Sequence, residues 1–134
     1  MTDHIADMLT RIRNGQQVKA AVVNLQPFSP KICVALLKIM RAEGYIRGFR
    51  EVYELGKKFS YVQVFLKYGT QGEPAIRQIY RVSTLGRRYY SSTKALWQPK
   101  GTMGILVLST PSGLLTDREA RRLNLGGEVI FGIY

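Results

Sequence analysis

Apolar residues in the first half of the chain switch between helical and strand-like spacing, which confines the fold to a mixture of helices and strands. They recur at the spacing of one helix face in two segments, first at Ile5, Met8, Leu9 and Ile12, then at Cys33, Leu36, Leu37 and Met40. From residue 61 to residue 68 the apolar residues alternate instead, which predicts a strand with these side chains on one face: Val62, Val64, Leu66 and Tyr68.

The ends of the two helices are marked by residues that favour caps. Thr2 or Asp3 can accept hydrogen bonds from the first free backbone N–H groups, and Asn14-Gly15 offers the first helix a left-handed stop. Ser29-Pro30 places a cap and a first-turn proline before the second helix, which we expect to end at Gly44.

The order of elements predicts an α+β protein of two small lobes. Short β-prone runs at 21–25 and 45–52 give residues 1–70 the order α-β-α-β-β, an N-terminal α/β lobe. The turn-rich segment 69–74 is the best candidate boundary before residues 71–134, a C-terminal lobe that we expect to be mostly β with one short helix.

A capping box marks the short helix of the second lobe. Thr116 stands at the N-cap and Glu119 three residues later, so that each side chain can accept from the other's backbone N–H. The helix is expected to run to about Asn124. Strands are expected around it at 76–82, 88–90, 104–108 and 128–134.

Positive charge is spread over both lobes. The chain carries 20 Lys and Arg against 9 Asp and Glu, a formal net charge of +11, on a composition that is 46% apolar. Residues 1–70 hold 11 basic and 5 acidic residues, a net +6, and residues 71–134 hold 9 and 4, a net +5. This predicts a folded basic surface that meets an anionic partner, which can be nucleic acid, an anionic membrane surface or an acidic protein.

Cysteine and histidine are too scarce for most catalytic and metal-binding classes. Cys33 and His4 are single, which excludes an intramolecular disulfide and multi-cysteine or paired-histidine metal sites. Cys33 lies on an apolar helix face and is predicted to be a core residue, while His4 lacks a partner for acid–base work. Asp3 and Asp7 could share a hard cation, but the helix dipole accounts for both. The sequence therefore indicates no enzyme, no cofactor and, without an apolar run of about 18 residues, no membrane span.

Arginines alternate with tyrosines early in the second lobe. Guanidinium groups bind phosphates through paired hydrogen bonds and tyrosine rings stack on bases, so an RNA contact is one interpretation. An edge hairpin with a solvated charged face is the other, and the pattern alone does not separate them. The stretch contains Arg77, Tyr80, Arg81, Arg87, Arg88, Tyr89 and Tyr90.

A loop rich in hydroxyl groups follows the apolar strand expected at 104–108. Its sequence, Ser109-Thr110-Pro111-Ser112-Gly113, can offer hydroxyls and backbone amides to phosphates, ribose hydroxyls and base edges. Taken alone, an ordinary turn from strand to helix is the simpler interpretation.

With this loop and the segments that follow it, the sequence resembles a known family, small-subunit ribosomal protein eight, and the resemblance runs from residue 5 to the last residue. The resemblance rests on Ser109-Thr-Pro-Ser-Gly113, on Thr116-Asp-Arg-Glu-Ala-Arg121 and on Leu125-Gly-Gly-Glu128. The opening segment Ile5-Ala-Asp-Met-Leu-Thr-Arg-Ile-Arg-Asn14 is similar to the family's first helix, and Arg81-Val-Ser83 with Gly86, Arg88 and Tyr90 is similar to its central hairpin.

The resemblance implies a structural component of the small ribosomal subunit. Such a protein binds the central domain of the small-subunit rRNA directly and supports subunit assembly and translation. It also contacts neighbouring small-subunit proteins, the fifth among them. We expect neither a membrane partner nor a homo-oligomer, and the alternative function is a non-ribosomal RNA- or DNA-binding regulator.

Carried over by position, the resemblance implies two RNA-contacting regions. In the C-terminal region, Ser109 and Thr110 would contact an internal loop of the RNA, with Ser112 beside them in the same loop. Gly127 and Glu128 would border the same surface, and Arg88 and Tyr90 would extend it. The N-terminal region would meet a second RNA segment through Thr10, Arg11, Arg13, Asn14 and Lys31.

The loop departs from the family pattern at two positions. Pro111 stands where the family has serine and Ser112 where it has lysine, so one hydroxyl and one charge are lost. Proline also removes a backbone donor, for which the Ser112 hydroxyl is expected to substitute in part. Because such drift suits an organellar ribosome, a mitochondrial small subunit is favoured over a bacterial one.

Overall fold

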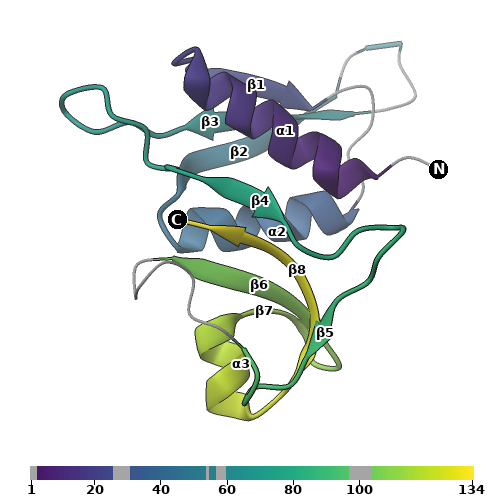
Figure 1. Ribbon diagram of the computed structural model, residues 1–134. Helices are drawn as coiled ribbons and strands as arrows, with labels where there is room; N and C mark the ends of the chain where they lie inside the picture. Colours follow the sequence, from purple (N-terminus) through teal and green to yellow (C-terminus); the bar gives the residue numbers. More distant parts are fainter. Residues whose placement is uncertain (1–2, 26–30, 54, 57–59, 97–103) are drawn as a thin grey trace. The chain divides into compact units, whose positions relative to one another are not determined.

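The computed structural model forms two compact units, Met1–Ile76 and Arg77–Tyr134 (Figure 1). The division that the sequence predicts after residue 70 falls inside the first unit, before Ile76. Among the described residues, no helix is long and apolar enough to span a bilayer. The structure describes residues 3–25, 31–53, 55–56, 60–96 and 104–134.

The first unit packs two helices on a three-stranded antiparallel sheet of order β1-β3-β2. Helix α1 contacts β1 and β3, helix α2 contacts β2, and the helices contact each other, so both cover one face of the sheet. The predicted order α-β-α-β-β is confirmed. The elements are α1 (His4–Gln17), β1 (Val22–Leu25), α2 (Lys31–Ala42), β2 (Ile46–Val52) and β3 (Tyr61–Leu66).

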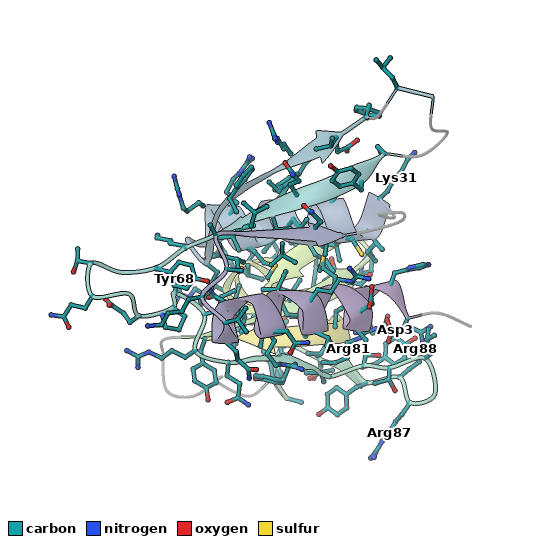
Figure 2. All side chains as sticks on the ribbon, turned by 90° about the horizontal axis from the view of Figure 1, so that it is seen from above. Asp3, Lys31, Tyr68, Arg81, Arg87 and Arg88 are labelled. Carbon is teal, nitrogen blue, oxygen red and sulfur yellow. The ribbon has the colours of Figure 1, made fainter. Side chains whose placement is uncertain are left out.

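The core of this unit follows the predicted apolar spacing. Val62, Val64 and Leu66 are buried on β3 and alternate with half-buried residues, as a strand with one covered face requires. The strand ends at Leu66, earlier than predicted, because Tyr68 leaves the ladder. Its hydroxyl donates to the Ala20 carbonyl oxygen at 2.6 Å (Figure 2).

Helix α1 continues past its predicted end, so the expected stop at Asn14-Gly15 is wrong. Both residues are helical, and the left-handed conformation is taken instead by Lys19, with φ of 57°. Gly15 is required by packing, since a Cβ there would lie 2.4 Å from Cγ2 of Val23. The glycine lets the helix approach β1 closely. The cap predicted at Ser29-Pro30 lies outside the described residues.

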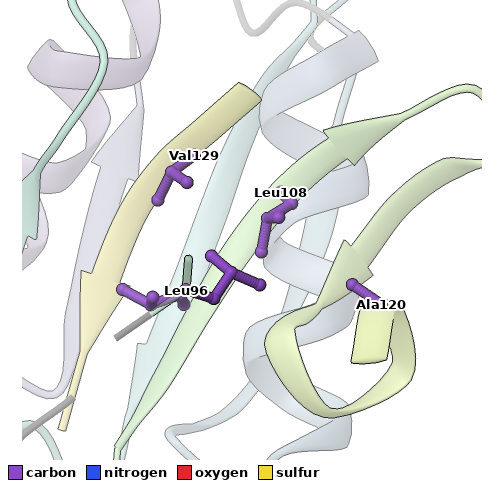
Figure 3. Close-up of a cluster of buried hydrophobic side chains, with 5 residues drawn as sticks. Leu96, Leu108, Ala120 and Val129 are labelled. Atoms are coloured by element: carbon purple, nitrogen blue, oxygen red, sulfur yellow. The ribbon is translucent and has the colours of Figure 1, made fainter. Parts of the chain in front are cut away.

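The second unit is a five-stranded antiparallel sheet with one short helix. The prediction of a mostly β lobe with one short helix is confirmed, but the strand β7 is not among the four expected. The strand path is β4-β8-β6-β7, and β5 also pairs with β8. Helix α3 places Ala120 on an apolar cluster with Leu96, Leu106, Leu108 and Val129 (Figure 3). The elements are β4 (Ile79–Arg81), β5 (Tyr90–Ser91), β6 (Ile105–Thr110), β7 (Gly113–Thr116), α3 (Asp117–Leu123) and β8 (Gly127–Ile133).

The segment after Leu108 is a β-hairpin, so the interpretation as a strand-to-helix turn is wrong. Ser109 and Thr110 belong to β6 and pair with β7 in antiparallel register, Thr110 opposite Gly113. β7 is only four residues long and ends at Thr116, the N-cap of α3. It is too short for an alternation of apolar and polar residues to be visible in the sequence. The capping box is confirmed, because Thr116 accepts from the backbone N–H of Glu119.

Candidate nucleic-acid interface

The Glu128 carboxylate lies at the centre of the candidate site in the second unit. On β8, Glu128 is opposite Tyr90 of β5 on one side and opposite Ser109 of β6 on the other. Its Oε2 accepts hydrogen bonds from Ser83 Oγ at 2.5 Å and from Arg88 Nη1 at 3.0 Å. The register therefore brings together Arg88, Tyr90, Ser109 and Glu128, which the sequence places in three separate segments.

The environment of Glu128 keeps this carboxylate ionised. Burial by itself raises its pKa, but hydrogen bonds from Ser83 and Arg88 and the charges of Arg88 and Arg81 outweigh burial and lower the pKa below its usual value. Only 18% of the Glu128 side chain is exposed, against 48% for Arg88. Since a carboxylate repels phosphate, the geometry suits a role in orienting Arg88 rather than in binding an anion.

Ser83 organises the turn that carries Arg87 and Arg88. Its fully buried hydroxyl donates to Glu128 and accepts from the backbone N–H of Tyr89 at 3.2 Å. Thr84 and Arg87 close the turn, with their backbone N–H groups bonded to each other's carbonyl oxygens at 2.9 and 3.3 Å. Figure 2 shows the Arg87 side chain extending away from the chain. This turn thus presents cations on a fixed backbone.

The arginine–tyrosine stretch separates into structural and exposed members. Arg81 is half-buried and donates to the Ile130 carbonyl oxygen at 2.7 Å. The Tyr80 ring covers Gly132, where a Cβ would lie 2.3 Å from Tyr80 Cζ. The members that remain exposed are Arg77, Arg87, Arg88, Tyr89 and Tyr90.

The glycine pair before Glu128 lets β8 pass between two backbones. A Cβ on Gly126 would lie 2.6 Å from the Ser91 carbonyl oxygen, and one on Gly127 would lie 2.1 Å from the Ser109 carbonyl oxygen. Gly127 therefore sets the spacing between Glu128 and the 109–113 loop.

The Thr110 hydroxyl is used by its own hairpin. It donates to the Gly113 carbonyl oxygen at 2.8 Å and accepts from the Ser112 N–H at 3.2 Å. Gly113 takes a φ of +103°, which closes the turn. Pro111 and Ser112 are exposed at the tip, and Ser109 is half-buried beside Glu128. The loop thus offers the Ser112 hydroxyl to a partner, with Thr110 fixing its position.

The predicted residues of the first unit lie on two helices. Thr10, Arg13 and Asn14 share one face of α1 by their i, i+3 and i+4 spacing, with Thr10 and Asn14 exposed and Arg13 half-buried. Lys31 is exposed in the first turn of α2 (Figure 2).

Arg11 has two partners, one on its own helix and one on β1. Its Nε lies 3.1 Å from Asp7 Oδ2, and its Nη1 donates to the Asn24 carbonyl oxygen at 3.2 Å. Asp3 is also used locally, since its side chain accepts from the N–H of Ala6 as the N-cap of α1. Among the described residues, no group of three or more His, Cys, Asp or Glu could hold a metal ion.

Cys33 is a core residue, as its helix face predicts. It is 2% exposed, and its Sγ donates to the His4 carbonyl oxygen at 3.7 Å, which puts the start of α2 beside the start of α1. Burial, followed by the charges of Asp3 and Asp7, raises the pKa of the thiol to about 11. The group is neutral and unsuited to nucleophilic work.

Ser83 is the residue whose role sequence reasoning missed. It belongs to the Arg81-Val-Ser83 motif, yet no spacing links a serine there to a glutamate 45 residues later. Only the pairing of β8 with the segments around it reveals the contact.

Comparison with known proteins gives a family for the whole described fold. Residues 3–134 match the family described as Ribosomal protein S8. The chain is 47% identical over 134 residues to small ribosomal subunit protein uS8 of Erythrobacter litoralis and 45% identical over 134 residues to that of Rickettsia akari. It is 48% identical over 136 residues to that of Sphingopyxis alaskensis. Each comparison covers 100% of this chain and 98% of the relative. The chain therefore belongs to the ribosomal protein S8 family.

Proposed function

We propose that this protein is a structural component of the small ribosomal subunit that binds the central domain of the small-subunit rRNA and supports subunit assembly and translation. The observation that carries the proposal is the register at Glu128, which places exposed Arg88 and Tyr90 beside the Ser109 loop. Family membership and the net charge of +11 support it.

Different residues of the second unit have different roles in binding the RNA. Arg87 and Arg88 bind phosphates and give affinity that falls with salt, while Tyr90 stacks on a base or sugar. Hydroxyls of Ser109 and Ser112 contact the RNA internal loop. The remaining predicted residues fix the geometry of this surface: Thr110 through the hairpin turn, Gly127 through close approach and Glu128 through Arg88.

A second RNA segment meets the first unit. Thr10, Arg13 and Asn14 form its contact on one face of α1, and Lys31 adds a cation at the start of α2. Arg11 contributes charge from beside β1, to which it is tied by the Asn24 carbonyl oxygen.

Salt-dependent binding tests the role of the cations. Removing one phosphate-binding cation, with Arg87→Ala or Arg88→Ala, should weaken binding to a central-domain rRNA fragment and reduce the slope of log K against log salt by about 1. Arg122→Ala, which removes an exposed cation from α3, is the matched control and should change neither quantity. An unchanged slope in both Arg87→Ala and Arg88→Ala would refute the assignment.

Ser109→Ala tests recognition by the loop. The variant should weaken binding to the cognate fragment more than binding to a random duplex, because a hydroxyl contact carries site recognition while charge does not. Equal loss on both RNAs would refute a recognition role for the loop.

The setting of the protein within a ribosome is also a proposal. We infer one copy per subunit, with neighbouring small-subunit proteins including the fifth as partners. Stable co-sedimentation with small subunits at high salt distinguishes this role from that of an RNA- or DNA-binding regulator outside the ribosome. The mitochondrial compartment stays a prediction based on Pro111 and Ser112, and the relatives compared above are bacterial proteins.

A further inference from the structure

We propose that the face of the β1-β3-β2 sheet turned away from the helices is a stacking platform for the bases of single-stranded RNA. This surface shares no residue with the sites assigned above. The inference rests on the proposed function only in taking RNA as the partner.

Strand register defines which residues form this face. Side chains alternate along a strand, and residues paired across strands share a side. Since Val62, Val64 and Leu66 are buried toward the helices, the residues between them and their cross-strand partners point the other way. The platform consists of Tyr61, Gln63 and Phe65 on β3, Val22 and Asn24 on β1, and Gly48, Arg50 and Val52 on β2.

Phe65 and Arg50 provide two flat groups at the centre of the platform. The Arg50 guanidinium carbon lies 5.9 Å from the centroid of the Phe65 ring. Arg50 Nε donates to Gln63 Oε1 at 2.7 Å, which holds the guanidinium over the sheet. Aromatic rings and guanidinium planes are the two protein groups on which unpaired bases stack.

Gly48 leaves space beside the Phe65 ring. The two residues are paired across β2 and β3, and a Cβ on Gly48 would meet no atom within 4 Å. An open hollow of about 310 Å³ lies here, lined by Arg47, Gly48 and Phe65. The space beside the Phe65 ring is therefore open to a base on the Gly48 side, while the Arg50 guanidinium lies over the ring.

Charge favours RNA over a protein as the occupant. Arg47 and Arg50 are exposed, and the platform residues defined above include no Asp or Glu. Glu51 pairs with Val62, so it points to the opposite side, where its carboxylate accepts from the Tyr53 hydroxyl at 2.6 Å. Apolar surface flanked by arginines matches a strand of bases linked by phosphates.

Binding of a labelled oligouridylate of about eight nucleotides to the full chain, followed by fluorescence anisotropy, tests the platform. Phe65→Leu removes the ring but keeps an apolar strand residue, and Gly48→Val fills the hollow with a side chain that strands favour. Each variant should bind about fivefold more weakly or worse, with an unchanged salt slope because no charge is lost. Arg50→Ala should also lower the slope, by about 0.7.

Two further measurements separate stacking from charge and from other occupants. The wild type should bind an abasic oligomer of the same length more weakly than the uridine oligomer. Phe65→Leu and the wild type should bind the abasic oligomer with equal affinity. Equal affinity for the abasic and uridine oligomers, or wild-type affinity in both Phe65→Leu and Gly48→Val, would overturn the proposal. If the Gly48→Val protein no longer associates with small subunits but binds the oligomer as the wild type does, the RNA platform is overturned in favour of a protein neighbour.

The two proposals fail in different ways. Phe65→Leu should change affinity for the central-domain fragment less than about twofold, because that site lies on other residues. Failure of the wild type to bind this fragment would refute the proposed function. If the wild type binds the fragment but Phe65→Leu and Gly48→Val bind the oligouridylate as tightly as the wild type does, the platform alone is refuted.

Discussion

The Ser83 hydroxyl and the Glu128 carboxylate share a hydrogen bond of 2.5 Å across 45 residues of sequence. The bond joins the turn that carries Arg87 and Arg88 to the central strand β8. Because Glu128 also binds Arg88, one carboxylate fixes both the backbone and a guanidinium of the basic surface. Disturbing this contact should therefore affect stability and RNA affinity together.

Removing the Ser83 hydroxyl should destabilise the fold. Ser83→Ala leaves the Tyr89 N–H and one oxygen of Glu128 without this partner in a partly buried place, a loss of about 1–3 kcal/mol in the free energy of unfolding. Urea unfolding measures the change. Ser92→Ala, at an exposed position nearby, is the control and should be neutral. Equal stability of the two variants would contradict the structural role of Ser83.

Acid should weaken the contribution of Glu128. Its pKa in the folded protein is lowered, so the stabilisation is complete above the usual glutamate pKa of about 4.3 and is lost as pH falls through the lowered value. Glu128→Gln should be less stable than the wild type at neutral pH, and the difference should shrink in acid. Thermal midpoints of both proteins across this range check the sign. A difference that grows in acid would contradict it.

The Cys33 thiol should be protected in the folded protein. Its pKa of about 11 and its burial leave almost no accessible thiolate at about pH 8, where free cysteine is partly ionised. Iodoacetamide should therefore label Cys33 only after unfolding in urea, with mass spectrometry as the readout. Rapid labelling of the folded chain would show that α1 and α2 open at their N-terminal ends.

The sequence predicted most of the fold because apolar spacing reports which face is covered. The two helices and β3 are long enough for this pattern to repeat. It failed where packing overrides local preference, as at Gly15, which resembles a helix stop but provides close contact with Val23. It also failed at β7, which is too short for alternation to show.

The site was predictable as a set of residues but not as an arrangement. Motifs identified Arg88, Ser109 and Glu128, and their spacing gave no reason for them to meet. Their meeting depends on β8 lying between β5 and β6, a long-range pairing. The roles of Thr110 and Glu128 follow from hydrogen bonds that only the folded register creates.

Gly127 should tolerate no side chain, although it lies in a strand where larger residues are usually favoured. A Cβ there would come within 2.1 Å of the Ser109 carbonyl oxygen, so Gly127→Ala must separate β8 from β6 and should cost about 1–3 kcal/mol. The same shift moves Glu128 away from Ser109, so binding to the central-domain fragment should weaken as well. Gly86→Ala is the matched control, because a Cβ at Gly86 meets nothing within 4 Å and should leave stability unchanged. Urea unfolding and RNA binding of both variants decide the matter: a Gly127→Ala protein as stable as Gly86→Ala would show that the two strands are not held at this spacing.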